Sequence, residues 1–142
     1  MRGALMISIS TLAMAIVATA CDASDDPPGP GGATRGDRPS STGTVTIVSP
    51  ANGDVIEGTS VDLRVELDDA RIVPQTTREI SPDEGHLHVY LDGALISMTE
   101  GTEQEVTGLT PGPHRIQVEF VAADHAPFDP RVVTIAAFQV RA

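Results

Sequence analysis

Residues 61–67 read Val-Asp-Leu-Arg-Val-Glu-Leu, with an apolar side chain at every odd position and a charged one at every even position. Successive side chains of a β-strand point to opposite faces of a sheet, so this stretch predicts a strand with one buried and one solvated face. Residues 86–91, His-Leu-His-Val-Tyr-Leu, alternate in the same way. The Asp92-Gly93 pair that follows is typical of a two-residue hairpin turn, and it predicts pairing with a second strand over residues 94–98.

The period-two pattern continues along the chain from residue 44 onward. Further strands are predicted over residues 44–49, 104–107, 114–121 and 131–140. Turn residues separate the strands at roughly 8–12-residue spacing, and no segment has a convincing helical period. About seven strands in a domain of this size predict an all-β fold class, an antiparallel sandwich of immunoglobulin or fibronectin type over residues 44–142.

The apolar side chains that share one parity within the strands form the predicted core: Val45, Ile47, Leu63, Val65, Leu67, Leu87, Val89, Leu91, Ile116, Val118 and Phe120. One connection in the predicted domain is unusually long. It runs from Asp68 to Gly85 and contains Pro74 and Pro82. Loops of this length in compact domains are often functional or mobile, which makes this segment a functional candidate.

The start of the chain has the three-part layout of a secretory signal, predicted over residues 1–20. Arg2 supplies a positive start, residues 5–17 are mainly apolar, and small residues precede Cys21. Residues 17–21, Val-Ala-Thr-Ala-Cys, resemble a bacterial lipobox, although that motif often has leucine at one of the first two positions. The resemblance implies that the sulfur of Cys21, the only cysteine, carries a diacylglyceryl group and that the mature chain begins there. The expected location is extracytoplasmic, with a membrane as partner through this lipid; a secreted soluble form and an uncleaved anchor are the alternatives.

Residues 21–43 differ in composition from both neighbouring segments. They contain no aliphatic residue larger than alanine and no aromatic residue, and they are rich in proline, glycine, serine and aspartate. Such a segment cannot bury enough apolar surface to offset the entropy of ordering it, so a disordered linker is predicted. Its role would be to hold the folded domain away from the bilayer.

The charge of the chain excludes one class of partner. The chain has no lysine, and without Arg2 the eight remaining arginines oppose 20 acidic side chains, which gives a net charge of −12. A chain this acidic repels phosphate backbones, so nucleic acid is not an expected partner.

The predicted domain resembles a family of small bacterial secreted domains of unknown function, over most of residues 45–140. The resemblance implies the sandwich and the export but no activity. The family commonly carries a further histidine at the position of Leu87. The matching segments, in order, are Ser49-Pro50-Ala51-Asn52-Gly53, Gly85-His86-Leu87-His88, Leu91-Asp92, Gly101-Thr102-Glu103, Leu109-Thr110-Pro111-Gly112-Pro113-His114 and Asp124-His125-Ala126-Pro127.

All four histidines lie in the predicted domain. His86 and His88 are two residues apart on one strand, so their side chains share a face and can share a metal ion. Neutral imidazole binds copper and zinc well. A copper or zinc site is therefore a hypothesis, with His86, His88 and the loop residue His125 as ligands and Glu119 as a further candidate. The alternative is structural: each ring bonds and fixes its own loop.

His114 is expected to stand apart from that group. It shares parity with Ile116 and Phe120, so it faces the core, whereas the pair on residues 86–91 faces away from it. A four-histidine site is therefore not expected. Because His114 follows a Pro-Gly-Pro turn, its predicted role is structural, as a side chain that bonds a loop carbonyl and locks the turn.

No catalytic residues are predicted, and the chain is not expected to be an enzyme. It has no nucleophile elbow, phosphate-binding loop or HExxH helix, and its single cysteine is assigned to the anchor. The leading functional hypothesis is a lipid-anchored binding or structural module of the cell envelope. Periplasmic copper or zinc binding is the second hypothesis, and an enzyme of unrecognised type is the third.

Overall fold

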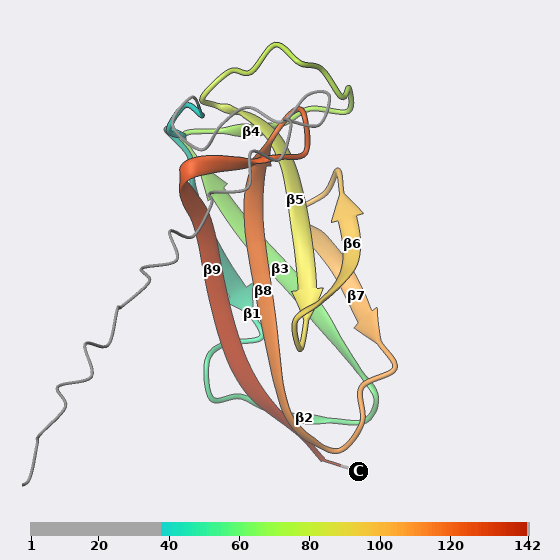
Figure 1. Ribbon diagram of the computed structural model, residues 1–142. Helices are drawn as coiled ribbons and strands as arrows, with labels where there is room; N and C mark the ends of the chain where they lie inside the picture. The colour runs from blue at the N-terminus through green and yellow to red at the C-terminus, as the bar shows by residue number, and fades with distance from the viewer. Residues whose placement is uncertain (1–37, 142) are drawn as a thin grey trace, which may run out of the picture. The chain divides into compact units, whose positions relative to one another are not determined.

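The computed structural model describes residues 38–141, which form nine β-strands and no helix (Figure 1). Residues 1–37, with the predicted signal segment, Cys21 and most of the predicted linker, lie outside the described residues. Within residues 38–141 there is no helix that is long and apolar enough to cross a membrane. The strands are β1 (Thr44–Ser49), β2 (Val55–Glu57), β3 (Ser60–Asp68), β4 (Arg71–Ile72), β5 (Glu84–Leu91), β6 (Ala94–Thr99), β7 (Glu103–Thr107), β8 (Gly112–Ala122) and β9 (Pro127–Arg141).

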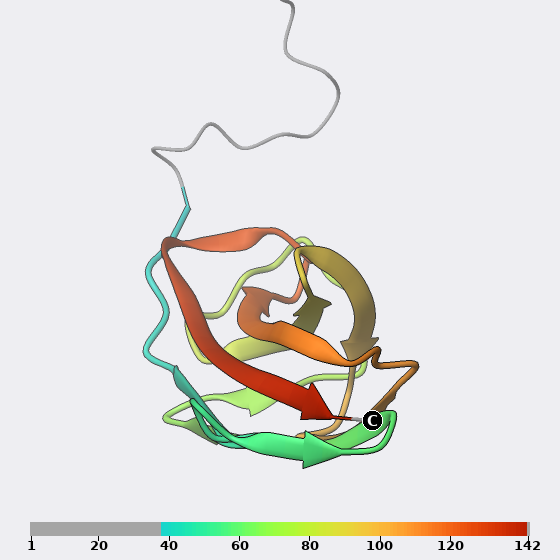
Figure 2. The ribbon, with the colours of Figure 1, turned by 90° about the horizontal axis from the view of Figure 1, so that it is seen from below.

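The strands form two sheets that face one another across the core. One sheet has the order β1-β3-β7, and the other has the order β2-β9-β8-β5, with β4 and β6 both pairing with β5 on its far side. Seen along its length, the domain is two curved layers with the core between them (Figure 2). The predicted all-β sandwich of immunoglobulin or fibronectin type is thereby confirmed, with β2 and β4 as short additions to the seven predicted strands.

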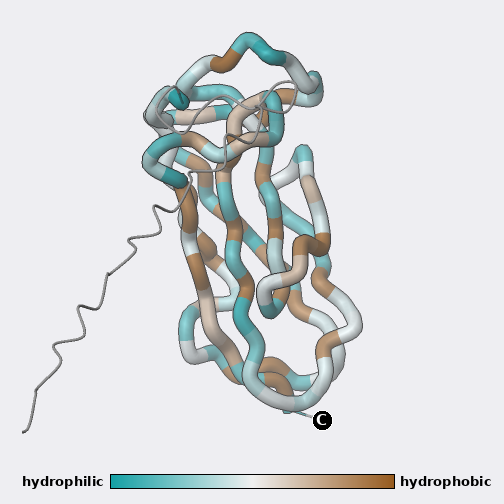
Figure 3. The backbone as a smooth tube through the Cα atoms, viewed as in Figure 1, coloured by the Kyte–Doolittle hydropathy of each residue, from teal (hydrophilic) through white to brown (hydrophobic). Residues whose placement is uncertain are grey.

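The core is built from the side chains that the sequence alternation predicted to be buried. Figure 3 shows apolar and polar residues alternating along the strands. Eight of the predicted core side chains are buried, and the other three, Ile47, Leu67 and Leu91, are partly buried against them. Leu87, Val89, Ile116 and Val118 are 0% exposed. The predicted core is confirmed, and it also contains side chains that the prediction did not include: Val61, Val106, Leu109, Ala122, Phe128, Phe138 and Val140.

The predicted hairpin after residue 91 is present between β5 and β6. Asp92 and Gly93 have φ angles of 50° and 87°. A two-residue turn of this kind needs positive φ at both central positions, which aspartate tolerates and glycine adopts freely. The Asp92 carboxylate also accepts a hydrogen bond from the Arg115 backbone N–H at 2.8 Å, which ties the turn to β8.

The folded unit begins earlier than predicted. Residues 38–43, assigned to the disordered linker from their composition, lie against the sandwich: the Thr42 N–H donates to the Pro82 carbonyl at 3.0 Å. The Arg38 side chain is only 8% exposed and pairs with Asp124. Composition could not anticipate this contact, because its partner is 86 residues away along the chain. The last six residues of the predicted linker therefore belong to the domain.

Candidate functional site

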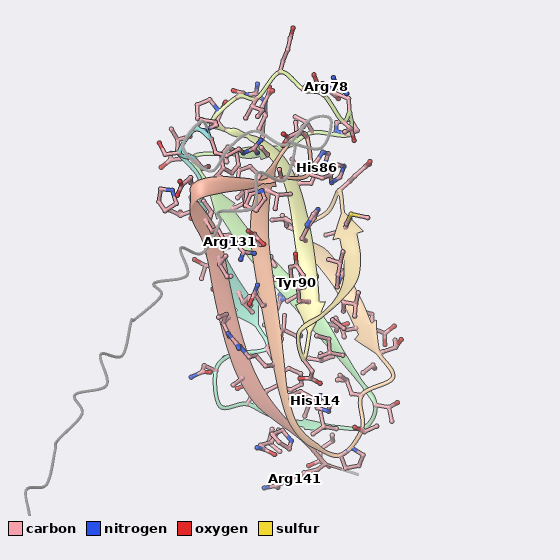
Figure 4. All side chains as sticks on the ribbon, viewed as in Figure 1. Arg78, His86, Tyr90, His114, Arg131 and Arg141 are labelled. Carbon is pink, nitrogen blue, oxygen red and sulfur yellow. The ribbon has the colours of Figure 1, made fainter. Side chains whose placement is uncertain are left out.

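Strand β5 carries His86 and His88 on the face of its sheet that points away from the core. Between and after them, Leu87 and Val89 are fully buried in the core, so the two imidazoles must stand on the other face. That face would normally be solvated, yet His86 is 4% and His88 is 7% exposed. Neighbouring loops therefore cover the two rings at this end of the sandwich. In Figure 4, His86 lies at the upper end of β5.

The short loop between β8 and β9 brings His125 onto this pair. His125 has a left-handed φ of 63°, and its N–H donates to the Ala122 carbonyl at 2.8 Å, which closes a tight turn. Its ring stacks on His86 with centroids 4.2 Å apart and planes 4° apart. Its Nδ1 lies 3.2 Å from Nε2 of His88. The structure thus gathers the three histidines singled out in the sequence into one cluster, which we call the histidine cluster.

The long connection between β3 and β5 also contacts the histidine cluster. The hydroxyl of Thr76 lies 3.0 Å from Nε2 of His125, and the Thr77 N–H donates to the Ala123 carbonyl at 3.1 Å. His86 Nε2 lies 3.4 Å from the same carbonyl, which only accepts, so this nitrogen carries the proton. The connection that we expected to be functional because of its length therefore contributes a polar partner, Thr76, to the histidine cluster.

Arg38 fixes the loop that carries His125. Its guanidinium donates to both carboxylate oxygens of Asp124, at 2.6 and 2.9 Å, and to the backbone carbonyls of Ala126 and Pro127, each at 2.9 Å. The hydrogen bonds from Arg38 to the carboxylate hold the pKa of Asp124 below its usual value. A planar guanidinium with four such bonds is a rigid clamp, so the position of His125 depends on a residue that the sequence analysis assigned to the linker.

The electrostatics around His86 and His88 favour uncharged rings at these two positions. Burial lowers the pKa of His86 and of His88, and the neighbouring His125 lowers both further. Glu119, the cross-strand partner of His88 on β8, opposes this effect on His88. Neutral imidazoles keep a nitrogen lone pair available for a metal ion or a hydrogen-bond donor.

Glu119 itself is committed to a different partner. Its side chain is 1% exposed, and both of its oxygens accept from Arg131 on β9, one of them from Nε at 2.6 Å. Figure 4 shows Arg131 beside β8 and β9, away from His86.

Among residues 38–141, no three histidine, cysteine or acidic side chains converge closely enough, as they lie, to hold a metal ion. The reason is that His86 stacks flat on His125 and turns its Nε2 to a carbonyl, so only two imidazole nitrogens face each other.

His114 lies at the opposite end of the sandwich from His86 (Figure 4). Its Nε2 lies 2.7 Å from the Thr110 carbonyl and its Nδ1 lies 2.7 Å from the Asp92 carboxylate. The carbonyl of Thr110 raises the pKa of His114, burial opposes this, and Asp92 raises it again. The ring bridges the Pro-Gly-Pro turn and the β5–β6 hairpin, and it is not part of the histidine cluster.

Three contributors to the site carry no recognisable sequence signal. Arg38, Thr76 and Arg131 are ordinary polar residues whose partners lie between 12 and 86 residues away along the chain. Only the folded arrangement of loops and paired strands brings these pairs together.

No protein-family model and no curated protein matches this chain. Among solved structures, fibronectin(III)-like modules of CbhA from Clostridium thermocellum match with 19% identity over 68% of this chain and 94% of that chain, at a TM-score of 0.49. The PKD domain of human KIAA0319 matches with 13% identity over 78% of this chain and 91% of that chain, at a TM-score of 0.45. At such identities the similarity is one of fold.

Proposed function

We propose that this protein is a lipid-anchored β-sandwich module of the bacterial cell envelope, and that its folded domain binds a ligand at the histidine cluster. The observation that carries the binding role is the gathering of three imidazoles at one end of the sandwich, two of them less than a tenth exposed. Burying polar rings costs free energy, and the hydrophobic core of the sandwich does not need these rings. Buried titratable side chains gathered at one place are typical of functional sites.

A metal ion is a ligand that the spacing of two ring nitrogens in the cluster would accommodate. Two nitrogens that each bind one zinc or copper ion at about 2.0–2.1 Å, at a tetrahedral angle, lie about 3.3 Å apart. Nδ1 of His125 and Nε2 of His88 lie 3.2 Å apart. The same distance fits a hydrogen bond, so the pair fits both a metal-free and a metal-bound state.

The lipid anchor is tested by replacing the one residue on which it depends. Cys21→Ala is expected to shift the protein out of the membrane fraction and to remove the mass of the acyl chains, because each buried methylene contributes about 0.8 kcal/mol to membrane binding. Cell fractionation and intact-mass measurement check both points. Ser24→Ala, a change in the same predicted linker, is the control and should leave location and mass as in the parent.

If the Cys21→Ala protein stays in the membrane with an unchanged mass, the lipid anchor is wrong. The binding role of the histidine cluster would be unaffected by that result, because it depends on residues of the folded domain alone.

A further inference from the structure

We propose that the thioether of Met98 joins His88 and His125 to form a copper(I) site at the edge of the larger sheet. The inference rests on the proposed function, since it takes the histidine cluster as the binding site and names its ligand. It differs from the sequence-based metal hypothesis in its third ligand, which is Met98 in place of His86, and in the metal that follows from that ligand.

The two nitrogen donors already lie 3.2 Å apart, and each ring has only to turn until its lone pair points at a shared ion. Each neutral ring carries one proton, so freeing Nδ1 of His125 and Nε2 of His88 for a metal needs a change of tautomer in one ring only. The proton of His125 then sits on Nε2, which lies 3.0 Å from the hydroxyl oxygen of Thr76. An outer hydrogen-bond partner of this kind fixes the tautomer and orientation of a metal-binding histidine.

The third donor comes from the neighbouring strand. Met98 on β6 is the direct cross-strand partner of His88 on β5. Direct partners project from the same face of a sheet with Cβ atoms about 4.5–5.5 Å apart. Met98 is 59% exposed, more than any other large apolar side chain among the described residues, so core packing does not account for it. Its three rotatable side-chain bonds can bring the sulfur to an ion beside the His88 ring.

The available donors favour copper(I) over zinc. Zinc would prefer a carboxylate or thiolate as its third ligand. The carboxylate nearest in register to His88 is that of Glu119, and Arg131 already occupies both of its oxygens. A thioether is a soft ligand that selects copper(I). Two imidazoles and a thioether are all neutral, so copper(I) leaves a smaller net charge in this poorly solvated site than a divalent ion would.

The test is a competition titration of copper(I) against a chromophoric chelator, under reducing conditions without oxygen. The protein is the full chain with Cys21→Ser, which removes a competing thiol. Met98→Leu keeps the volume and removes the sulfur, while Met1, Met6 and Met14 remain in both proteins. His125→Asn removes one nitrogen donor with a residue that tolerates the left-handed backbone at this position.

Met98→Leu is expected to weaken copper(I) binding by at least about tenfold, since even the outer hydrogen-bond partners of a metal site contribute about 10–100-fold to affinity. Zinc affinity should stay within about twofold, because zinc gains little from a thioether. His125→Asn should weaken both metals. X-ray absorption at the copper edge should show a sulfur neighbour in the parent and none in Met98→Leu.

If Met98→Leu binds copper(I) as tightly as the parent while His125→Asn does not, the inference is overturned and the histidine cluster remains the metal site. If the parent binds neither copper(I) nor zinc, both the inference and the metal as ligand are overturned. Met98 is exposed on an edge strand, so the folded state of Met98→Leu should match the parent by circular dichroism.

Discussion

Replacing Gly85 by alanine is expected to destabilise the domain by about 3–4 kcal/mol, at the upper end of the cost of overpacking a protein interior. A Cβ atom on Gly85 would lie 1.9 Å from the carbonyl oxygen of Val121 and 3.0 Å from the Phe120 ring. Gly85 pairs with Ala122 in the β5–β8 ladder, so relief of the clash must move one of two hydrogen-bonded strands. Glycine is needed here for close approach of two backbones.

Urea unfolding of the parent and the variant measures this effect. Gly101→Ala is the matched control, because a Cβ there meets no atom closer than 3.7 Å and should cost less than about 1 kcal/mol. Because Gly85 immediately precedes His86, the variant should also disturb the histidine cluster. A Gly85→Ala protein as stable as the Gly101→Ala protein would show that β5 and β8 do not approach as closely as described.

Replacing Arg131 by methionine is expected to cost about 2–3 kcal/mol. Breaking a buried ion pair by removing one partner costs about 3–5 kcal/mol, and the value is reduced here because the Arg131 side chain is 56% exposed and already partly solvated. The cost arises because the Glu119 carboxylate, 1% exposed, loses both of its hydrogen bonds from Arg131. Arg131→Met keeps the aliphatic part of the side chain, so packing changes little.

The double variant Glu119→Leu with Arg131→Met should recover part of this loss, since it removes the unpaired charge together with its partner. Arg71→Met is the control: Arg71 is 63% exposed and pairs with Asp83 and Glu84 at the surface, where ion pairs contribute about 0–1 kcal/mol. Denaturant unfolding of the four proteins forms the comparison. Equal stabilities for Arg131→Met and Arg71→Met would contradict the role given to the buried carboxylate.

The fold was largely predictable because its signals are local. Alternation over residues 61–67 and 86–91 marks two strands that form the middle of their sheets, and Asp92-Gly93 encodes the hairpin through its backbone preference. The strands β2 and β4, two or three residues long, have no such signal. They form because β2 pairs in parallel with β9 and β4 pairs in parallel with β5. Such tertiary pairing cannot be predicted from a short stretch of sequence.

The site was predictable in part. Strand parity put His86 and His88 on one face and separated them from His114, and in the structure they are indeed apart. Parity also implied that this face is solvated. No sequence pattern indicates that two loops bury His86 and His88 on it. The approach of His125 depends on a left-handed turn and on the Arg38 clamp, both of which form only in the folded chain.

The role of the histidine cluster as the binding site of the domain is tested most directly by metal content. The full chain with Cys21→Ser, and the same protein with His88→Asn and His125→Asn, are dialysed to equilibrium against buffered copper or zinc and analysed for metal. We expect about one ion per chain in the parent and a loss of that ion in the variant. At 100 times the dissociation constant, the bound ion should stabilise the parent by about 2.7 kcal/mol. Equal metal content in the two proteins, or none in either, would contradict the role of the histidine cluster as the binding site.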